Sequence, residues 1–408
     1  MNIRKYNPEK DKKSVERIFK EVGWVNNEKE EKALNAFIKG CDTLVAEVKG
    51  EAEVAVASIP GSICYLDQEI KTNVIGAVTV SRTARKMGLA SKVTAQAVKN
   101  AVLNGEKLST LGMFEQGFYN RLGFGTGVYE HIISFDPGDL LVDKEVISPE
   151  RITIDDWEKI HQGRINRLRN HGSCNILSAD ITRGEMLWSE NGFGLGYYNP
   201  TGELSHHIWF NNTNGEHGPY QISWIVYQNK EQFYDLMALL KSLGDQVNAV
   251  RMIEPPGIQM QDLIKQPMKT RRIREKSKYK GENRAIAFWQ IRINDLNGCL
   301  AATHLSENIK FNLILNDPIE KYLANEGEWS GLSGQYIVEL GSSSHAEKGY
   351  NDSLLTLTAS IGAFSRLWFG VLPATSLAVT DELTGPQELL EELDRIMCLP
   401  VPRPDWEF

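Results

Sequence analysis

Residues 73–124 read NVIGAVTVSRTARKMGLASKVTAQAVKNAVLNGEKLSTLGMFEQGFYNRLGF, and this stretch decides the fold. A β-branched run that ends in Val78 and Val80 predicts a buried strand. After a short basic turn, residues 89–103 carry apolar side chains at helical spacing as far as Gly105. A second strand-like run then leads to an aromatic motif at residues 118–124.

The turn between the first strand and the helix has the composition of a pyrophosphate site. A helix N-terminus has unpaired backbone N–H groups and partial positive charge, and both favour a phosphate. Gly88 allows the backbone to approach phosphate oxygens, and Ala90 keeps the next position small. Arg85 and Lys86 supply countercharge. The turn alone would also suit an ordinary basic turn whose glycine is needed for packing.

With the aromatic motif included, the segment resembles the cofactor-binding half of a GNAT-type acetyltransferase. Those enzymes carry a V-x-V strand, then R/Q-x-x-G-x-G/A at a helix start, then an F-Y-x-x-G-F-like motif. The corresponding residues here are 78–80, 85–90 and 118–124. The resemblance implies acetyl-CoA as cosubstrate and no metal. It assigns cofactor binding to Val78, Val80, Arg85, Lys86, Gly88, Leu89 and Ala90.

Length and composition set the general class. The 408 residues are enough for two or three domains, and 41% hydrophobic with 24% charged residues is typical of a soluble globular protein. A net charge of −8 argues against nucleic acid as a partner and suits a cationic substrate. The five cysteines are scattered without a C-x-x-C pair, which favours reduced thiols over disulfides or zinc.

Targeting and metal signals are weak. The first thirteen residues are rich in charged side chains, which speaks against a signal peptide, and no apolar run reaches the length of a membrane span. We therefore expect a cytoplasmic protein with no membrane partner. His206 and His207 would point to opposite faces of a strand, and with His217 they lack metal-ligand spacing.

The chain divides into three blocks, predicted as domains at residues 1–139, 140–287 and 288–408. In the second block, strand-like runs at 204–210 and 221–227 precede a helical pattern at 231–243, which repeats the order of the first block. The second turn has no glycine and places Glu231 where a pyrophosphate would lie. The second block is therefore expected to be a GNAT-like unit without cofactor.

Two further segments each have two possible interpretations, and the two ends of the third block have one each. The basic cluster at residues 268–284 is either a nucleic-acid arm or an interdomain linker, and the scarcity of aromatics favours the linker. The apolar run at 354–370 predicts a core helix, with a ligand tunnel as the alternative use. A strand at 288–293 and a helix at 386–397 frame the third block.

This layout resembles the enhanced intracellular survival (Eis) acetyltransferases over essentially the whole chain. The resemblance implies an α+β (mixed α/β) fold: tandem GNAT units, the second without cofactor, then a sterol-carrier-like domain. It also implies a homo-oligomer, namely a hexamer. Tyr119 would be the general acid and the terminal carboxylate of Phe408 the base. Met87 and Phe114 depart from the family pattern, and Phe114 would either narrow the substrate tunnel or change what enters it.

The acid role of Tyr119 is chemically better supported than the base role of the Phe408 carboxylate. A tyrosine hydroxyl with a pKa of about 10 is a suitable proton donor to a thiolate. An α-carboxyl with a pKa of about 3.5 is a poor base unless burial raises that pKa, so Phe408 would abstract a proton, act through water or orient the amine. Trp24, Glu115 and Glu407 are the candidate substrate-binding residues.

The sequence thus predicts an acetyl-CoA-dependent N-acetyltransferase. Its acceptor would be a primary amine of an aminoglycoside- or polyamine-like small molecule, or of lysine. Two alternatives stay open at this point. One is a lipid- or acetyl-CoA-binding regulatory protein without turnover, and the other is an enzyme that acetylates proteins and uses the middle block as a docking surface.

Overall fold

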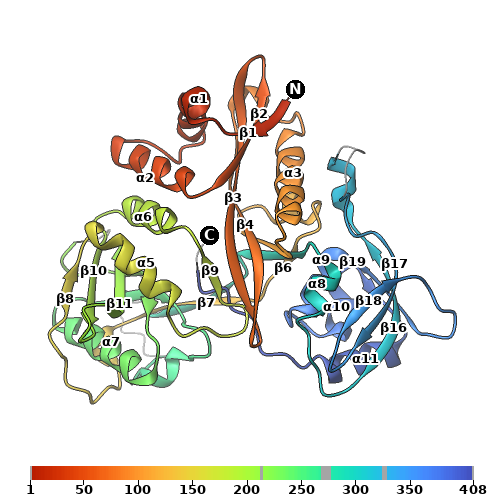
Figure 1. Ribbon diagram of the computed structural model, residues 1–408. Helices are drawn as coiled ribbons and strands as arrows, with labels where there is room; N and C mark the ends of the chain where they lie inside the picture. The colour runs from red at the N-terminus through yellow and green to blue at the C-terminus, as the bar shows by residue number, and fades with distance from the viewer. Residues whose placement is uncertain (1, 212–214, 268–276, 324–328, 407–408) are drawn as a thin grey trace.

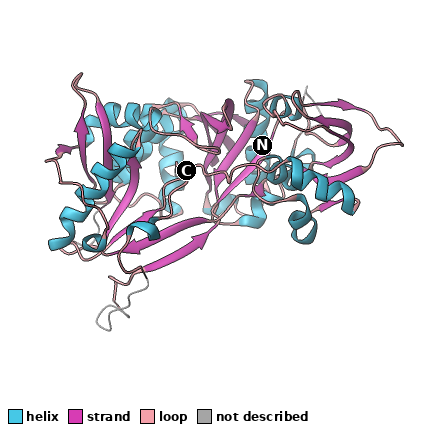
Figure 2. Cartoon of the chain, turned by 90° about the horizontal axis from the view of Figure 1, so that it is seen from below, coloured by secondary structure: helices cyan, strands magenta, loops and turns pink. Residues whose placement is uncertain are grey.

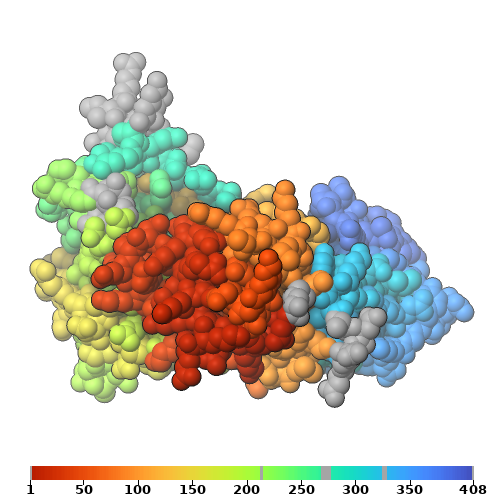
Figure 3. Space-filling model, turned by 90° about the horizontal axis from the view of Figure 1, so that it is seen from above, coloured from red at the N-terminus to blue at the C-terminus, as the bar shows by residue number. Residues whose placement is uncertain are grey.

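The computed structural model describes residues 2–211, 215–267, 277–323 and 329–406. Three lobes, each built on its own β-sheet, follow one another along the chain (Figure 1). Seen from above, the N-terminal lobe occupies the centre of the molecule, between the second and third lobes (Figure 3). The mixed α/β fold class predicted from the sequence is confirmed.

The first sheet has the strand order β1-β2-β3-β4-β5-β15-β6, and β9 joins it through β3. Its strands are β1 (Asn2–Lys5), β2 (Asp42–Val48), β3 (Glu51–Tyr65), β4 (Gln68–Val80), β5 (Leu108–Gly112), β6 (Gly125–Thr126), β9 (Cys174–Ile176) and β15 (Trp289–Ile293). The helices of this lobe are α1 (Pro8–Glu21), α2 (Glu28–Lys39), α3 (Leu89–Leu103) and α4 (Gln116–Asn120). Asn7 and Asn27 cap α1 and α2, because their side chains accept hydrogen bonds from backbone N–H groups in the first turn of each helix.

The second sheet has the order β14-β7-β13-β12-β11-β10-β8. Its strands are β7 (Glu130–Phe135), β8 (Glu150–Ile152), β10 (Phe193–Tyr198), β11 (Leu204–Asn211), β12 (Tyr220–Val226), β13 (Val250–Ile253) and β14 (Glu282–Ile286). The accompanying helices are α5 (Trp157–Ile165), α6 (Ala179–Trp188) and α7 (Lys230–Ser242). Helix α7 packs on this sheet through a buried apolar face, and α6 packs on α2 of the first lobe. Seen from below, helices and strands are mixed along the whole length of the molecule (Figure 2).

The third sheet has the order β18-β17-β16-β19-β20. Its strands are β16 (Ile309–Asn316), β17 (Gly334–Leu340), β18 (His345–Lys348), β19 (Thr356–Ser360) and β20 (Leu383–Thr384), and its helices are α8 (Leu296–Leu300), α9 (Ile361–Trp368), α10 (Ala374–Thr380) and α11 (Gln387–Ile396). The single helix predicted at residues 354–370 is wrong in its first half. Residues 356–360 pair with β16 because their alternating burial suits a strand, and the helix begins only after Ser360 caps it.

Strands cross between the lobes. β7, which precedes residue 139, pairs with β13 and β14 of the second sheet. β15 leads out of the second lobe and pairs with β5 and β6 of the first sheet. The lobes therefore share strands with their neighbours in sequence, and the domain boundaries at 139 and 287 stay a prediction. Among the described residues no helix is long and apolar enough to span a membrane.

Candidate active site

Strands β4 and β5 separate at the point where the site lies. They pair in parallel only through residues 72–74 of β4, although β4 continues to Val80. A bulge follows on β4, where Ala77 has φ +50° and the register against β3 shifts by one residue. The bulge turns the rest of β4 away from β5 and opens a gap in the sheet.

This gap leaves a backbone donor exposed on β4. The Ser81 N–H donates to the Glu53 carbonyl on β3 at 2.9 Å. Because successive N–H groups in an antiparallel strand point to opposite sides, the Val80 N–H points away from β3, to the side that β5 has left. Val78 and Val80 are half-buried and line the cavity that fills the gap. Such a donor can stabilise a carbonyl oxygen on which negative charge develops.

The turn before α3 forms an open cradle. Gly88 stands at the N-cap of α3 with φ +71° and no side-chain cap, and a Cβ built on it would meet nothing within 4 Å. The first N–H groups of α3 thus face open space. Arg85 and Lys86 are exposed beside it, whereas the Leu89 side chain packs in the core and offers only its backbone. These residues fit the pyrophosphate of acetyl-CoA.

A cavity of about 1080 Å³ joins the cradle to the gap in the sheet. All the predicted cofactor-binding residues line this cofactor cavity: Val78, Val80, Arg85, Lys86, Gly88, Leu89 and Ala90. Glu21 at the end of α1 stabilises the turn, because its carboxylate accepts a hydrogen bond from the Arg82 backbone N–H at 2.7 Å. The cavity therefore offers cationic and backbone donors at one end and the splayed strand at the other.

Tyr119 lies where the cofactor cavity meets a second cavity, and it lines both. It stands on the short helix α4 rather than on a strand, because Glu115 caps the turn by accepting from the Phe118 N–H. Only 4% of its surface is exposed, and burial, with a smaller contribution from Glu115, raises the pKa of Tyr119 to about 12. The hydroxyl consequently stays protonated at any physiological pH.

The second cavity, of about 600 Å³, lies between the first and second lobes. Trp24 and Phe114 line it together with the cofactor cavity, and their rings meet edge to face at 6.3 Å. Both rings remain well exposed, at 40% and 77%. They therefore form the rim that the two cavities share. Glu115 lines only the cofactor cavity, and its carboxylate is engaged in capping α4.

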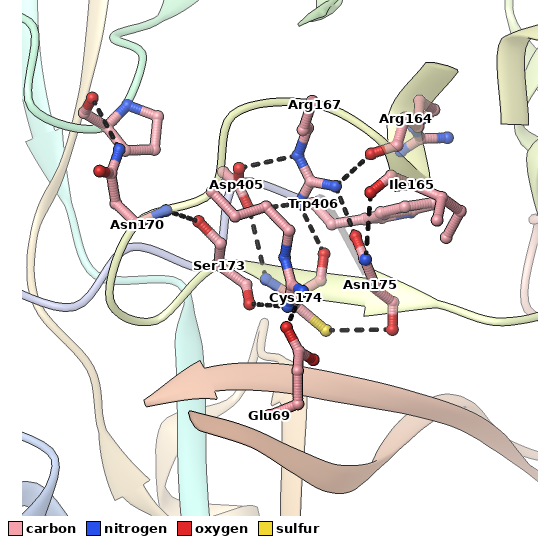
Figure 4. Close-up of polar contacts among 12 residues, drawn as sticks. Glu69, Arg164, Ile165, Arg167, Asn170, Ser173, Cys174, Asn175, Asp405 and Trp406 are labelled. Atoms are coloured by element: carbon pink, nitrogen blue, oxygen red, sulfur yellow. Dashed lines mark hydrogen bonds and ion pairs between the residues drawn. The ribbon is translucent and has the colours of Figure 1, made fainter. Parts of the chain in front are cut away.

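Trp406, the last described residue, lines this second cavity, and Figure 4 shows the hydrogen bonds between the preceding Asp405 and Arg167. The Asp405 carboxylate receives two hydrogen bonds from Arg167, at 2.8 and 2.6 Å. Trp406 is 3% exposed, and its indole N–H donates to Glu185 at 3.0 Å. Glu407 and Phe408, which the sequence places next, lie outside the described residues. Trp406 thus brings the end of the described chain to the cavity that Tyr119 also lines.

Sequence reasoning missed several residues of this second cavity. Arg164, Glu185 and Trp188 lie on α5 and α6, and Trp224 on β12 faces them. No motif surrounds them, since they meet only when the second lobe packs on the first. The guanidinium of Arg164 lies over the rings of Trp406 and Trp224, at 3.6 and 4.3 Å. The high tryptophan content near residues 188, 209 and 224 was the only available signal.

The corresponding turn of the second lobe is closed. Asn229 caps α7 by accepting from the Gln232 N–H, and the Gln232 side chain accepts in return from the Gln228 N–H. The Gln232 N–H in the first turn of α7 therefore has a side-chain acceptor, whereas the start of α3 has no side-chain cap. This difference agrees with a second unit that does not bind the cofactor. The described residues also contain no group of three or more His, Cys, Asp or Glu side chains placed for a metal ion.

Known proteins resemble this chain in two ways, through its N-terminal domain and through its overall fold. Residues 2–127 match the acetyltransferase (GNAT) domain family. A search of curated proteins gives no match. A probable N-acyltransferase from Enterococcus faecalis V583 has a TM-score of 0.78 at 15% identity, with 100% of this chain and 99% of that chain covered.

Two further solved structures match along their full length. A GCN5-related N-acetyltransferase from Anabaena variabilis has a TM-score of 0.76 at 14% identity, and 100% of both chains is covered. Eis1 from Mycobacterium abscessus has a TM-score of 0.74 at 12% identity, again with 100% of both chains covered. At these identities the likeness concerns the fold.

Residues 2–127 are therefore a GNAT acetyltransferase domain, and the chain as a whole has an Eis-like architecture. The match of residues 2–127 indicates an acetyl-transferring enzyme, and the whole chain shares its fold with proteins described as N-acyltransferases or N-acetyltransferases. The resemblance inferred from the sequence motifs is confirmed at this level. The assignment of the third lobe as sterol-carrier-like stays a prediction.

Proposed function

We propose that the protein transfers an acetyl group from acetyl-CoA directly to a primary amine. The observation that carries this proposal is the meeting of two cavities at Tyr119. One contains the anion cradle of α3 and the splayed end of β4, and the other lies between the first two lobes. A cofactor and an acceptor could thus reach the same side chain from opposite sides.

The residues around this meeting point would divide the chemistry. Acetyl-CoA, when bound, supplies the acetyl group as a thioester. The Val80 N–H would donate to the thioester carbonyl oxygen, and the Tyr119 hydroxyl would protonate the sulfur as the carbon–sulfur bond breaks. The amine nitrogen would form the new bond to the acetyl carbon and lose a proton. In this scheme the Phe408 carboxylate accepts that proton or orients the amine. Most of the acceleration would come from holding the two reactants together.

The direct test is thiol release from acetyl-CoA with a panel of acceptors. The panel contains an aminoglycoside, a polyamine, lysine, a lysine-containing peptide and a simple alkyl amine. Acetyl-CoA-dependent thiol release with at least one amine, with the acetylated product seen by mass spectrometry, supports the proposal. Binding of acetyl-CoA without turnover on any amine would contradict it and favour a regulatory acetyl-CoA-binding protein.

Several finer features belong to the same proposal. They rest on the Eis-like fold and on composition: a hexameric assembly, a cytoplasmic location, a sterol-carrier-like third domain and the absence of nucleic-acid and membrane partners. Light scattering of the purified protein tests the hexamer, and a mass near that of the 408-residue monomer would contradict it.

A further inference from the structure

Four cationic side chains line the cofactor cavity, and they lie in different places: Arg82, Arg85, Lys86 and Arg121. Arg85 and Lys86 lie in the turn before α3, beside the cradle that suits a pyrophosphate. The Arg82 guanidinium donates to the Glu21 carbonyl at 3.3 Å and is thereby tied to the end of α1. Arg121 stands apart from these three, directly after α4. The cavity therefore carries positive charge beyond that of the turn before α3.

The guanidinium of Arg121 is oriented by its own helix. Its Nε–H donates to the Gly117 carbonyl one turn earlier at 3.2 Å, and its central carbon lies 5.8 Å from the ring centre of Phe118. Within the described part of the chain, the two terminal nitrogens of Arg121 have no hydrogen-bond acceptor and no carboxylate partner. The side chain is exposed, so these two nitrogens can reach a ligand. An arginine held in this way is suited to bind a phosphate through two parallel hydrogen bonds.

The two carboxylates that line the same cavity are directed at groups other than Arg121. One oxygen of Glu21 pairs with Arg17 at 3.0 Å, and the other accepts from the Arg82 backbone N–H at 2.7 Å. The Glu115 carboxylate caps α4 and forms no ion pair with Arg121. The charge of Arg121 is therefore not matched by an ion-pair partner from the described walls of its own cavity.

Acetyl-CoA carries its negative charge in two separate places. The pyrophosphate has one charge on each of its phosphates, and the 3′-phosphate on the ribose is a monoester that carries nearly two at neutral pH. With the pyrophosphate at the cradle of α3, a second cation would stabilise the 3′-phosphate. Arg121 is the cation lining this cavity that lies outside the α3 turn and is not tied to Glu21.

We infer that Arg121 binds the 3′-phosphate of coenzyme A and so makes the protein select free coenzyme A thioesters as acetyl donors. This inference rests on the proposed function and specifies its donor. A thioester carried on a protein-bound phosphopantetheine has no 3′-phosphate, and 3′-dephospho-coenzyme A lacks that group as well. Neither molecule would engage Arg121, so both should bind more weakly than their counterparts with the phosphate.

The test compares two ligands that differ only in this phosphate. Binding of coenzyme A and of 3′-dephospho-coenzyme A to the full-length protein is measured by calorimetry in one buffer, because salt screens exposed charges. We expect the dissociation constant to be at least about 10-fold higher for 3′-dephospho-coenzyme A, the scale of charge-assisted hydrogen bonds. Arg121→Gln should weaken binding of coenzyme A by a similar factor and leave that of 3′-dephospho-coenzyme A unchanged, so that the two constants become equal.

Arg82→Gln is the matched control, because it removes another exposed arginine that lines the same cavity. This variant should keep the ratio of the two dissociation constants, even if the lost charge weakens both ligands. Equal binding of both ligands by the unmodified protein, or equal weakening of both by Arg121→Gln, would overturn the inference and leave the proposed function intact. Loss of the ratio in Arg82→Gln but not in Arg121→Gln would likewise overturn it. If the unmodified protein bound neither ligand, the inference and the proposed function would both fail.

Discussion

The Arg167 guanidinium holds the Asp405 carboxylate with two hydrogen bonds, at 2.8 and 2.6 Å, across 238 residues of sequence. Both side chains are nearly buried, at 6% and 10% exposure. Asp405 itself has φ +48°, so the backbone turns there before Trp406 enters the cavity wall. This ion pair therefore fixes the end of the described chain against the second lobe.

Asp405→Asn tests this anchor. The change leaves Arg167 charged and nearly buried without its carboxylate, and we expect unfolding free energy to fall by roughly 3 kcal/mol. Acetyl transfer should also fall, because Trp406 loses its support. Glu307→Gln is the control, since it removes an ion pair with Arg395 in which both side chains are 53% exposed. That control should leave the denaturant midpoint unchanged. Equal midpoints for the two variants would contradict the anchoring role.

Tyr119→Phe tests the proposed general acid. Loss of the hydroxyl should reduce kcat by about 10²-fold or more, whereas KM for acetyl-CoA should stay within twofold. Tyr129→Phe is the control, because Tyr129 is 65% exposed and lines neither cavity. With the pKa of Tyr119 near 12, activity of the unmodified enzyme should not fall through tyrosine ionisation below about pH 10. Full turnover by Tyr119→Phe would refute the assignment.

Gly88→Ala separates the cradle from backbone strain. Its φ of +71° makes any side chain unfavourable by about 1 kcal/mol, and the new methyl group would point into the open cradle. Gly105→Ala at the other end of α3 is a close match, with φ +91° and nothing within 4 Å of its Cβ. Both variants should lose similar stability, but only Gly88→Ala should raise KM for acetyl-CoA. A similar rise in KM for acetyl-CoA in both variants would show that the cradle is not part of the acetyl-CoA site.

Asp317→Asn tests a second long-range ion pair. Arg292 on β15 and Asp317 after β16 are both fully buried, and Arg292 also donates to the Leu122 carbonyl at 2.8 Å. Neutralising Asp317 leaves a buried guanidinium without its counterion, so we expect a loss of roughly 3–5 kcal/mol in urea unfolding. Glu339→Gln, in the exposed pair with Lys310, should not shift the midpoint. A loss no larger than that of the control would show that the pair does not stabilise the contact between the lobes.

His207→Gln tests an effect of pH on stability. His207 is fully buried and accepts from the Trp224 indole N–H at 3.3 Å, and burial lowers the pKa of His207 from 6.5 to about 3. Between these pH values the unfolded chain binds a proton that the folded chain does not, so stability is lost as pH falls from about 6.5 toward 3. The variant should flatten this part of the pH–stability curve. His304→Gln, at an exposed histidine, should keep the slope of the unmodified protein, and equal slopes in the two variants would contradict the prediction.

The sequence was most informative where chemistry depends on adjacent residues. The strand with Val78 and Val80, the turn at Gly88 and helix α3 appear where the pattern predicts them, because local spacing fixes them. Fold class and the GNAT assignment followed from the same segment. The sequence was less informative about the secondary structure around Tyr119, which lies on α4, and around residues 356–360. Short apolar runs do not distinguish a helix from a buried strand.

Gly123, at the end of the aromatic motif, and Gly125, just after it, show what a sequence motif cannot predict. A Cβ on Gly123 would lie 2.2 Å from Arg292, and one on Gly125 would lie 2.3 Å from the Gly362 carbonyl. These glycines are required by β15 and α9, which come more than 160 residues later. Nothing near the motif could have revealed that requirement, since the contacts form only when β15 joins the first sheet and α9 packs beside it.

The sequence by itself determined the fold class and the cofactor-binding segment, because a strand, a glycine turn and an amphipathic helix are encoded by neighbouring residues. Tertiary structure alone decided the acceptor side. Arg164, Glu185 and Trp188 become one wall with Trp24 and Trp406 only when two lobes and the end of the described chain meet. Within that wall Arg164 is paired with Glu185, which no local motif indicates. The net charge of a sequence is the sum over all its residues, whereas the charge available in a cavity depends on which groups are already paired.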